Sequence, residues 1–144
     1  MKDHPMLEAI KALVREQDLC VLATVGEDKP HCSLMGYAVD EECREIYMAT
    51  LKATRKFKNI SANPSVSILI DDRRQADLPK ALTVSGVFEP MEDQTAKDGV
   101  KAKLIRRRPD LAGLMGNEDA EIIRIKVYSF LLLQDPTTAG YIEL

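Results

Sequence analysis

The sequence predicts an α+β domain built on an antiparallel sheet of about six strands, with two or three flanking helices. Two observations lead to this fold class. Strand-like runs outnumber helical segments, and the turns that join the first three runs are too short for parallel crossovers. Closing the sheet into a barrel would protect its edge strands. With 144 residues, 45% of them hydrophobic, we expect a single domain over residues 1–144.

The first third of the chain predicts a helix and then a meander of three strands. Leu19–Val25 and His31–Asp40 flank a turn at residues 26–30 and therefore predict a hairpin. Ile46–Thr50 follows a second polar turn as the third strand. Before them, Pro5 suits the first position of a helix whose apolar residues recur at helical spacing. These residues are Met6, Leu7, Ile10, Leu13 and Val14.

The middle of the chain predicts a short helix between strands. Thr54–Ala62 has the helical pattern, and Asn63-Pro64 would end it because proline disfavours helical geometry in the residue before it. Ser65–Ile70 alternates between apolar and polar residues as a fourth strand. After a polar loop at residues 71–77, Ala81–Phe88 is the fifth strand, in which Gly86 suggests a bulge or a close approach of another segment.

The last third predicts a helix over Glu92–Arg107, a short turn through residues 111–115, and a long strand over Glu121–Leu133. The run Arg106-Arg107-Arg108-Pro109 is interpreted as the cationic end of the helix rather than a nucleic-acid patch. The long strand alternates apolar with polar residues, which predicts one covered face and one wetter face.

Composition excludes several classes of function. A net charge of −3, a pI near 5.4 and the lack of tryptophan disfavour a nucleic-acid-binding protein. The N-terminal segment carries acidic residues among its apolar ones, so we expect no signal peptide, no membrane span and a cytoplasmic protein. Cys20, Cys32 and Cys43 have no metal-binding spacing and are expected to be free thiols. His4 and His31 are too scattered for a metal site.

A basic strand-to-helix corner is the strongest local candidate for a binding site. Thr50, Thr54, Arg55 and Lys56 gather hydroxyl and cationic donors where a strand ends and a helix begins. The N-terminus of a helix adds unpaired N–H groups, and this combination suits a phosphate. The alternative is that Thr54 is an ordinary N-cap and that the basic residues form a solvated helix face.

The order of these elements and motifs resembles the pyridoxamine 5'-phosphate oxidase-like FMN-binding split-barrel family. The resemblance covers Leu19 to about Leu133. The motifs that carry it are Leu22-Ala23-Thr24-Val25 with Lys29-Pro30-His31, Ile46-Tyr47-Met48-Ala49-Thr50, Thr54-Arg55-Lys56, Asn63-Pro64-Ser65-Val66-Ser67 and Leu82-Thr83-Val84-Ser85-Gly86.

The resemblance implies a homodimer with FMN in two clefts between the subunits. It implies that the segment Ser33, Leu34, Met35 and Gly36 runs along the flavin ring, and that Ala49 and Thr50 meet the ring edge and the ribityl-phosphate side. Arg55 and Lys56 would pair with the phosphate, with help from Thr54. Ser33 stands where other members have a charged arginine, which should weaken phosphate binding unless Thr83, Ser85 or a residue of the partner subunit compensates, so Thr83 is a further candidate for cofactor binding. A phosphate dianion favours such charge-assisted donors.

The chain departs from family members that oxidise pyridoxamine phosphate. Those members have an arginine at the position of Ser33, a glutamine at that of Ala81, and a longer C-terminal segment with substrate-binding arginine, histidine and tryptophan. This chain ends at Leu144 without tryptophan. We therefore expect a substrate other than vitamin B6, and the cofactor could be FMN, a deazaflavin or haem.

Three functional interpretations stay open at the level of sequence. The first is an FMN-dependent oxidoreductase that acts on a small-molecule substrate or electron donor, with the chemistry residing in the flavin and no catalytic residue required. The second is a non-catalytic flavin- or haem-binding module, an electron carrier or cofactor store. The third is a dimeric barrel that binds another protein. Cys32 is interpreted as a half-buried structural thiol rather than a redox partner.

Overall fold

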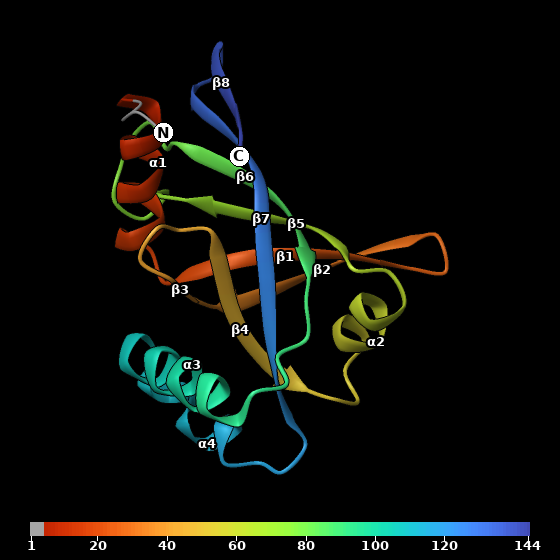
Figure 1. The fold of residues 1–144 in the computed structure, drawn as a ribbon. Helices are drawn as coiled ribbons and strands as arrows, with labels where there is room; N and C mark the ends of the chain where they lie inside the picture. The colour runs from red at the N-terminus through yellow and green to blue at the C-terminus, as the bar shows by residue number, and fades with distance from the viewer. Residues whose placement is uncertain (1–4) are drawn as a thin grey trace.

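The computed structural model describes residues 5–144, which form an eight-stranded antiparallel sheet flanked by helices (Figure 1). Hydrogen bonds link the strands in the order β2-β1-β5-β6-β7-β4-β3, with β8 paired to β7. The strands are β1 (Leu19–Gly26), β2 (Lys29–Gly36), β3 (Ala38–Val39), β4 (Glu45–Leu51), β5 (Ser65–Asp71), β6 (Ala81–Phe88), β7 (Ala120–Asp135) and β8 (Thr138–Glu143).

The helices lie at both ends of the long strand β7, as Figure 1 shows. Helix α1 lies near one end of β7. Near the other end, α3 and α4 lie on the side of β4, and α2 lies on the opposite side. The helices are α1 (Pro5–Glu16), α2 (Arg55–Ala62), α3 (Gln94–Arg107) and α4 (Ala112–Met115), with a 3-10 turn η1 (Pro109–Leu111) between the last two. Within residues 5–144, no helix is both long and apolar enough to span a membrane.

The predicted α+β antiparallel split barrel is confirmed, with more strands than the six expected. The run His31–Asp40 is not one strand, because β2 ends at Gly36 and the chain then pairs with β4 as β3. Only Tyr37 separates these two edge strands of the sheet, so the chain itself joins the two ends of the hydrogen-bonded path. Strand β8, which was not predicted, forms a hairpin with β7.

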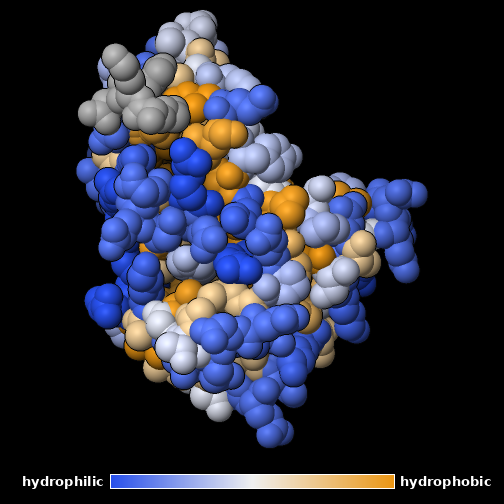
Figure 2. All heavy atoms as spheres, viewed as in Figure 1, coloured by the Kyte–Doolittle hydropathy of each residue, from blue (hydrophilic) through white to orange (hydrophobic). Residues whose placement is uncertain are grey.

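The core divides into two clusters on opposite sides of the β4–β7 pair. The larger cluster lies inside the curled sheet and includes the buried face of α1. The smaller cluster joins Tyr47, Ala49 and Ile122 to α3 and α4. The predicted alternation of β7 is confirmed, since Ile123, Ile125, Val127 and Ser129 are buried while the residues between them are more exposed. In the view of Figure 2 the outer surface is mostly hydrophilic, with small separate hydrophobic areas.

Gly86 lies at a bulge and also allows a close approach of β7, and a glycine within this strand predicted one or the other. The register between β6 and β7 shifts between Ser85 and Gly86, which is a bulge. A Cβ atom at Gly86 would lie 2.6 Å from both Ile125 Cγ2 and the carbonyl oxygen of Lys126, so only glycine fits against β7 there. The bulge bends β6 as it crosses the long strand.

Candidate functional site

The corner between β4 and α2 is tied together by its two threonines. Thr54 is the N-cap of α2, and its Oγ1 accepts a hydrogen bond from the N–H of Phe57 at 3.4 Å and donates one to the carbonyl of Leu51 at 2.9 Å. Thr50, buried near the end of β4, places its Oγ1 3.0 Å from that of Thr54. The interpretation of Thr54 as an ordinary N-cap is therefore confirmed. A capped helix start still leaves the first N–H groups, those of Arg55 and Lys56, for a ligand.

A cleft of about 320 Å³ opens beside this corner. Strand β2 forms one wall, the β4–α2 corner forms the second, and the η1–α4 segment forms the third. Seven of the ten predicted site residues line it together, although they come from separate parts of the sequence. The lining residues are Leu34, Met35, Gly36, Ala49, Thr50, Leu51, Thr54, Lys56, Leu111 and Leu114.

Three predicted site residues lie outside this cleft. Ser33 precedes its β2 wall and is half-buried. Arg55 is exposed and lines a neighbouring hollow of about 500 Å³ beside the β1–β2 turn and the outer side of α2. Thr83 is half-buried on β6, where it pairs with Leu69 and Leu131. In one chain, the cation that lines the cleft is therefore Lys56 alone among the described residues.

The sequence did not point to the third wall of the cleft. Leu111 and Leu114 belong to a short turn whose place depends on how α3 packs against the sheet. Next to them lies Arg108, whose Nε is buried and has no hydrogen-bond partner in the described part of the chain. A Cβ atom at Gly36 would lie 3.1 Å from Arg108 Cγ and 3.5 Å from that Nε. The missing side chain of Gly36 thus lets the arginine approach the rim of the cleft.

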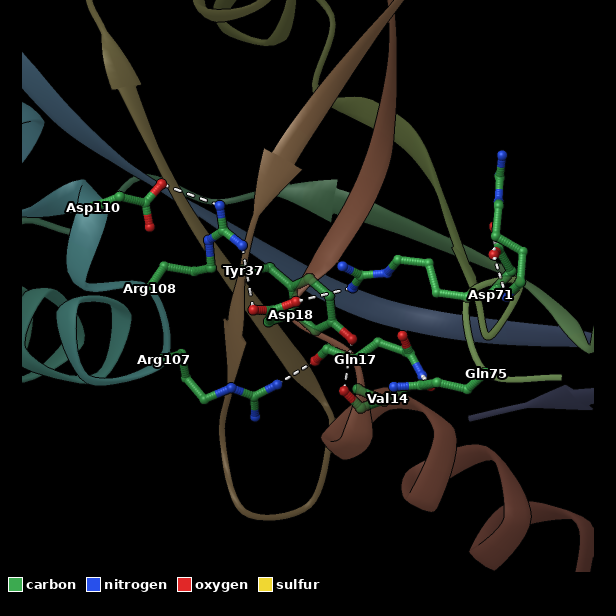
Figure 3. A network of polar contacts seen from close by, with 11 residues as sticks. Val14, Gln17, Asp18, Tyr37, Asp71, Gln75, Arg107, Arg108 and Asp110 are labelled. Atoms are coloured by element: carbon green, nitrogen blue, oxygen red, sulfur yellow. Dashed lines mark hydrogen bonds and ion pairs between the residues drawn. The ribbon is translucent and has the colours of Figure 1, made fainter.

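A network of polar contacts fixes Arg108 in this position, as Figure 3 shows. Its Nη1 lies 3.3 Å from Asp18 Oδ2, and its Nη2 lies 3.1 Å from Asp110 Oδ2. Burial by itself would raise the pKa of the Asp18 carboxyl, but the hydrogen bonds and charges of Arg108 and Arg74 outweigh it and lower that pKa. The terminal nitrogens are thus occupied by carboxylates, and Nε is the unpartnered donor.

No cysteine is among the described residues that line the cleft. Cys20 and Cys43 are buried, and burial raises the pKa of the Cys20 thiol to about 12. Cys32, which was predicted to be half-buried, is exposed instead. The reason is the alternation of β2, whose even-numbered residues Cys32 and Leu34 both face outward.

Another hollow, lined by Phe57, Ile60 and Ser61 of α2, is less suited to a phosphate. It measures about 390 Å³ and its walls are mainly apolar, with Phe57, Ile60 and Phe88 among them. Its charged lining residues, Lys97 and Glu121, face each other at 3.9 Å and so neutralise each other. The cleft beside Lys56 is the better candidate for an anionic cofactor because its cation has no acidic neighbour among the lining residues.

Fold and cleft together define an antiparallel split barrel with an open cleft beside the β4–α2 corner, and comparison with known proteins gives the family. The family model described as pyridoxamine 5'-phosphate oxidase matches residues 6–132, so the chain belongs to this family. A pyridoxamine 5'-phosphate oxidase homolog of Schizosaccharomyces pombe is 35% identical over 77 residues, which are 48% of this chain and 40% of that protein. The match thus spans less than half the length of that relative.

Solved structures share the fold at low sequence identity. A heme binding protein from Mycobacterium smegmatis superposes with a TM-score of 0.87 at 14% identity, over 99% of this chain and 60% of that one. A FAD-binding protein from Mesorhizobium loti superposes with a TM-score of 0.72 at 18% identity, over 90% of this chain and 94% of that one. The fold is therefore one on which proteins described as flavin-binding and as haem-binding are both built.

Proposed function

We propose that this protein binds FMN in the cleft between β2, the β4–α2 corner and the η1–α4 segment, and that it acts as an FMN-dependent oxidoreductase in the cytoplasm. The observation that carries the proposal is the polarity of the cleft. Lys56, in the first turn of α2, lies on one wall, and Leu34, Leu111 and Leu114 lie on the others. An amphipathic ligand with a phosphate and a planar apolar ring system matches that distribution.

The chain's own residues supply binding and orientation in this proposal. Lys56 and the N–H groups of Arg55 and Lys56 would hold the phosphate, since charge-assisted hydrogen bonds are the strongest available. The backbone of β2 from Ser33 to Gly36 would run along the ring, with Leu111 and Leu114 on the facing wall. When bound, FMN supplies the electron or hydride transfer, so no catalytic side chain is needed.

The proposal includes a homodimer that closes the cleft. One row of residues crosses the outer face of the sheet, each paired with the next on the neighbouring strand. From β2 to β8 the row comprises Leu34, Val21, Leu69, Thr83, Leu131 and Tyr141. Leu34, Tyr141 and Leu131 are 71%, 58% and 43% exposed, and apolar side chains exposed along one continuous row are typical of an interaction surface. Because Leu34 also lines the cleft, a second copy seated on the row would cover the open side of the cofactor site.

The second candidate is a flavin- or haem-binding module without turnover, an electron carrier or cofactor store. The similarity in fold to a protein described as haem-binding favours it. Haem would need an axial ligand, and the described residues that line the cleft include no histidine, cysteine or tyrosine. His31 lies on β2 outside the lining, and His4 lies outside the described residues. We therefore rank FMN first, with deazaflavin as a related alternative.

Absorbance of the purified full chain tests the proposal, because flavin, deazaflavin and haem have different spectra. We expect a flavin spectrum, or FMN binding at micromolar concentration in a calorimetric titration of colourless protein. Oxidation of a nicotinamide cofactor by the flavin-loaded protein under oxygen would support the oxidoreductase, whereas a bound flavin without turnover would favour the second candidate. A Soret band with no flavin binding would overturn the proposal.

A further inference from the structure

A second candidate site lies where α1 meets β1, and it shares no lining residue with the cofactor cleft. Three segments distant in the sequence converge there: the end of α1, the loop after β5 and the end of α3. They surround an open hollow of about 740 Å³. Its lining residues are Arg15, Glu16, Asp18, Arg74, Gln75 and Arg107.

Each of the three arginines is anchored through one terminal nitrogen. Arg107 Nη2 donates to the carbonyl of Gln17, Arg74 Nη2 lies 3.3 Å from Asp18 Oδ1, and Arg15 Nη2 donates to the carbonyl of Glu41. Figure 3 shows Arg107 and Gln75 on either side of Gln17, which is itself buried and bonded to Gln75. The anchors hold the guanidinium groups in place, and the remaining N–H groups of each have no hydrogen-bond partner in residues 5–144.

The charges of the hollow do not cancel. Three arginines face two acids, Glu16 and Asp18, and the Asp18 carboxylate is also shared with Arg108 behind the hollow. Guanidinium groups match the oxygens of phosphate better than other cations do, because their planar forks can donate two parallel hydrogen bonds. An anion with several oxygens could bridge arginines from different segments at once.

From this convergence we infer that the hollow between α1, the β5–β6 loop and the end of α3 binds a phosphate-bearing small molecule through Arg15, Arg74 and Arg107. The arginine run at the end of α3 then has a role besides ending the helix, since Arg107 faces the hollow while Arg106 is exposed outside it. This inference does not depend on which cofactor the cleft holds.

Calorimetric titration of the full chain with inorganic phosphate, pyrophosphate and ADP tests the inference. We expect pyrophosphate to bind, and Arg74→Gln and Arg15→Gln each to weaken it by about tenfold, as the loss of one charge-assisted contact implies. Arg106→Gln is the matched control and should leave the affinity unchanged. Equal affinity for phosphate and ADP would identify free phosphate as the ligand, whereas tighter binding of ADP would identify a nucleotide.

A second control separates the hollow from the cofactor cleft. Lys56→Ala removes the cation of the cleft and should leave pyrophosphate binding intact, while Arg74→Gln should leave FMN binding intact. The inference is overturned if no probe binds at millimolar concentration, if Arg106→Gln loses as much affinity as Arg74→Gln, or if Lys56→Ala alone abolishes pyrophosphate binding.

Discussion

The hydroxyl oxygens of Thr50 and Thr54 lie 3.0 Å apart and join the end of β4 to the N-cap of α2. Thr54 gives its proton to the carbonyl of Leu51, so the proton between the two hydroxyls must come from Thr50. Both hydroxyl protons are therefore used inside the corner. A phosphate at this corner would rely on Lys56 and on the first N–H groups of α2, with the threonines acting as its scaffold.

Thr50→Val tests this division of roles. Valine keeps the shape of threonine and removes the buried hydroxyl, so we expect a loss of about 1 kcal/mol in the free energy of unfolding. FMN affinity should change less than about threefold, because the hydroxyl proton is not available to the phosphate. Urea denaturation and calorimetry measure the two effects. A large loss of FMN affinity at unchanged stability would instead make Thr50 a direct ligand.

Lys56→Ala should weaken FMN binding by about tenfold or more, since a charge-assisted contact is worth at least about 1.4 kcal/mol. Riboflavin binding should barely change, because riboflavin lacks the phosphate. Lys58→Ala, on the same helix but outside the cleft lining, is the matched control. Equal losses for FMN and riboflavin would place Lys56 away from the phosphate.

Arg55→Ala completes this comparison. Arg55 lines the hollow beside the cleft, so we expect a smaller loss than for Lys56→Ala. If Arg55→Ala weakened FMN binding as much as Lys56→Ala does, the Arg55 side chain would have to turn toward the phosphate when FMN is bound.

Leu131→Arg should dissociate the proposed dimer. Leu131 lies near one end of the exposed row and pairs with both Thr83 and Tyr141, so a charge there would have to be buried without a partner. Size-exclusion chromatography with light scattering measures the mass. Leu78→Arg is the control, because Leu78 is 72% exposed and lies in the β5–β6 loop outside the row. A wild-type monomer, or a variant that remains dimeric, would contradict this interface.

The sequence predicted the elements whose residues alternate between core and solvent. Ala81–Phe88 matches β6, and Leu19–Val25 and Ser65–Ile70 match β1 and β5 to within one residue. The break at Tyr37 was not predicted although Gly36 directly precedes it, because the change of pairing partner from β1 to β4 is decided by the curl of the sheet. Strand β8 was not predicted because Thr138–Glu143 lacks a regular apolar alternation, and Ile142 is its one buried residue.

The candidate site likewise contains residues that local sequence motifs predicted and residues that only tertiary packing brings to the cleft. Local motifs predicted the residues of β2 and of the β4–α2 corner, and the fold brings most of them to one cleft. Leu111, Leu114 and Arg108 could not be predicted, because a short turn after α3 reaches β2 only through tertiary packing. The separation of Arg55 from Lys56 was also hidden, since consecutive residues at a helix start point in different directions.

Acid should weaken the network around Asp18. The arginines hold the folded-state pKa of Asp18 below its ordinary value of about 3.9, in spite of the opposing effect of burial. A carboxylate whose pKa is depressed on folding adds stability above its unfolded pKa, and this stability is lost as the pH falls through the folded pKa.

We therefore expect Asp18→Asn to destabilise the protein at pH 7 and to lose less stability than the wild type below about pH 4. Asp71 and Asp135 also have lowered pKa values, so the difference between the two curves is the quantity to measure by urea denaturation across pH. Asp77→Asn, in the exposed β5–β6 loop, should follow the wild-type curve. Parallel curves for Asp18→Asn and the wild type would show that the ion pairs with Arg74 and Arg108 contribute nothing to folding, because the carboxylate would then titrate alike in both states.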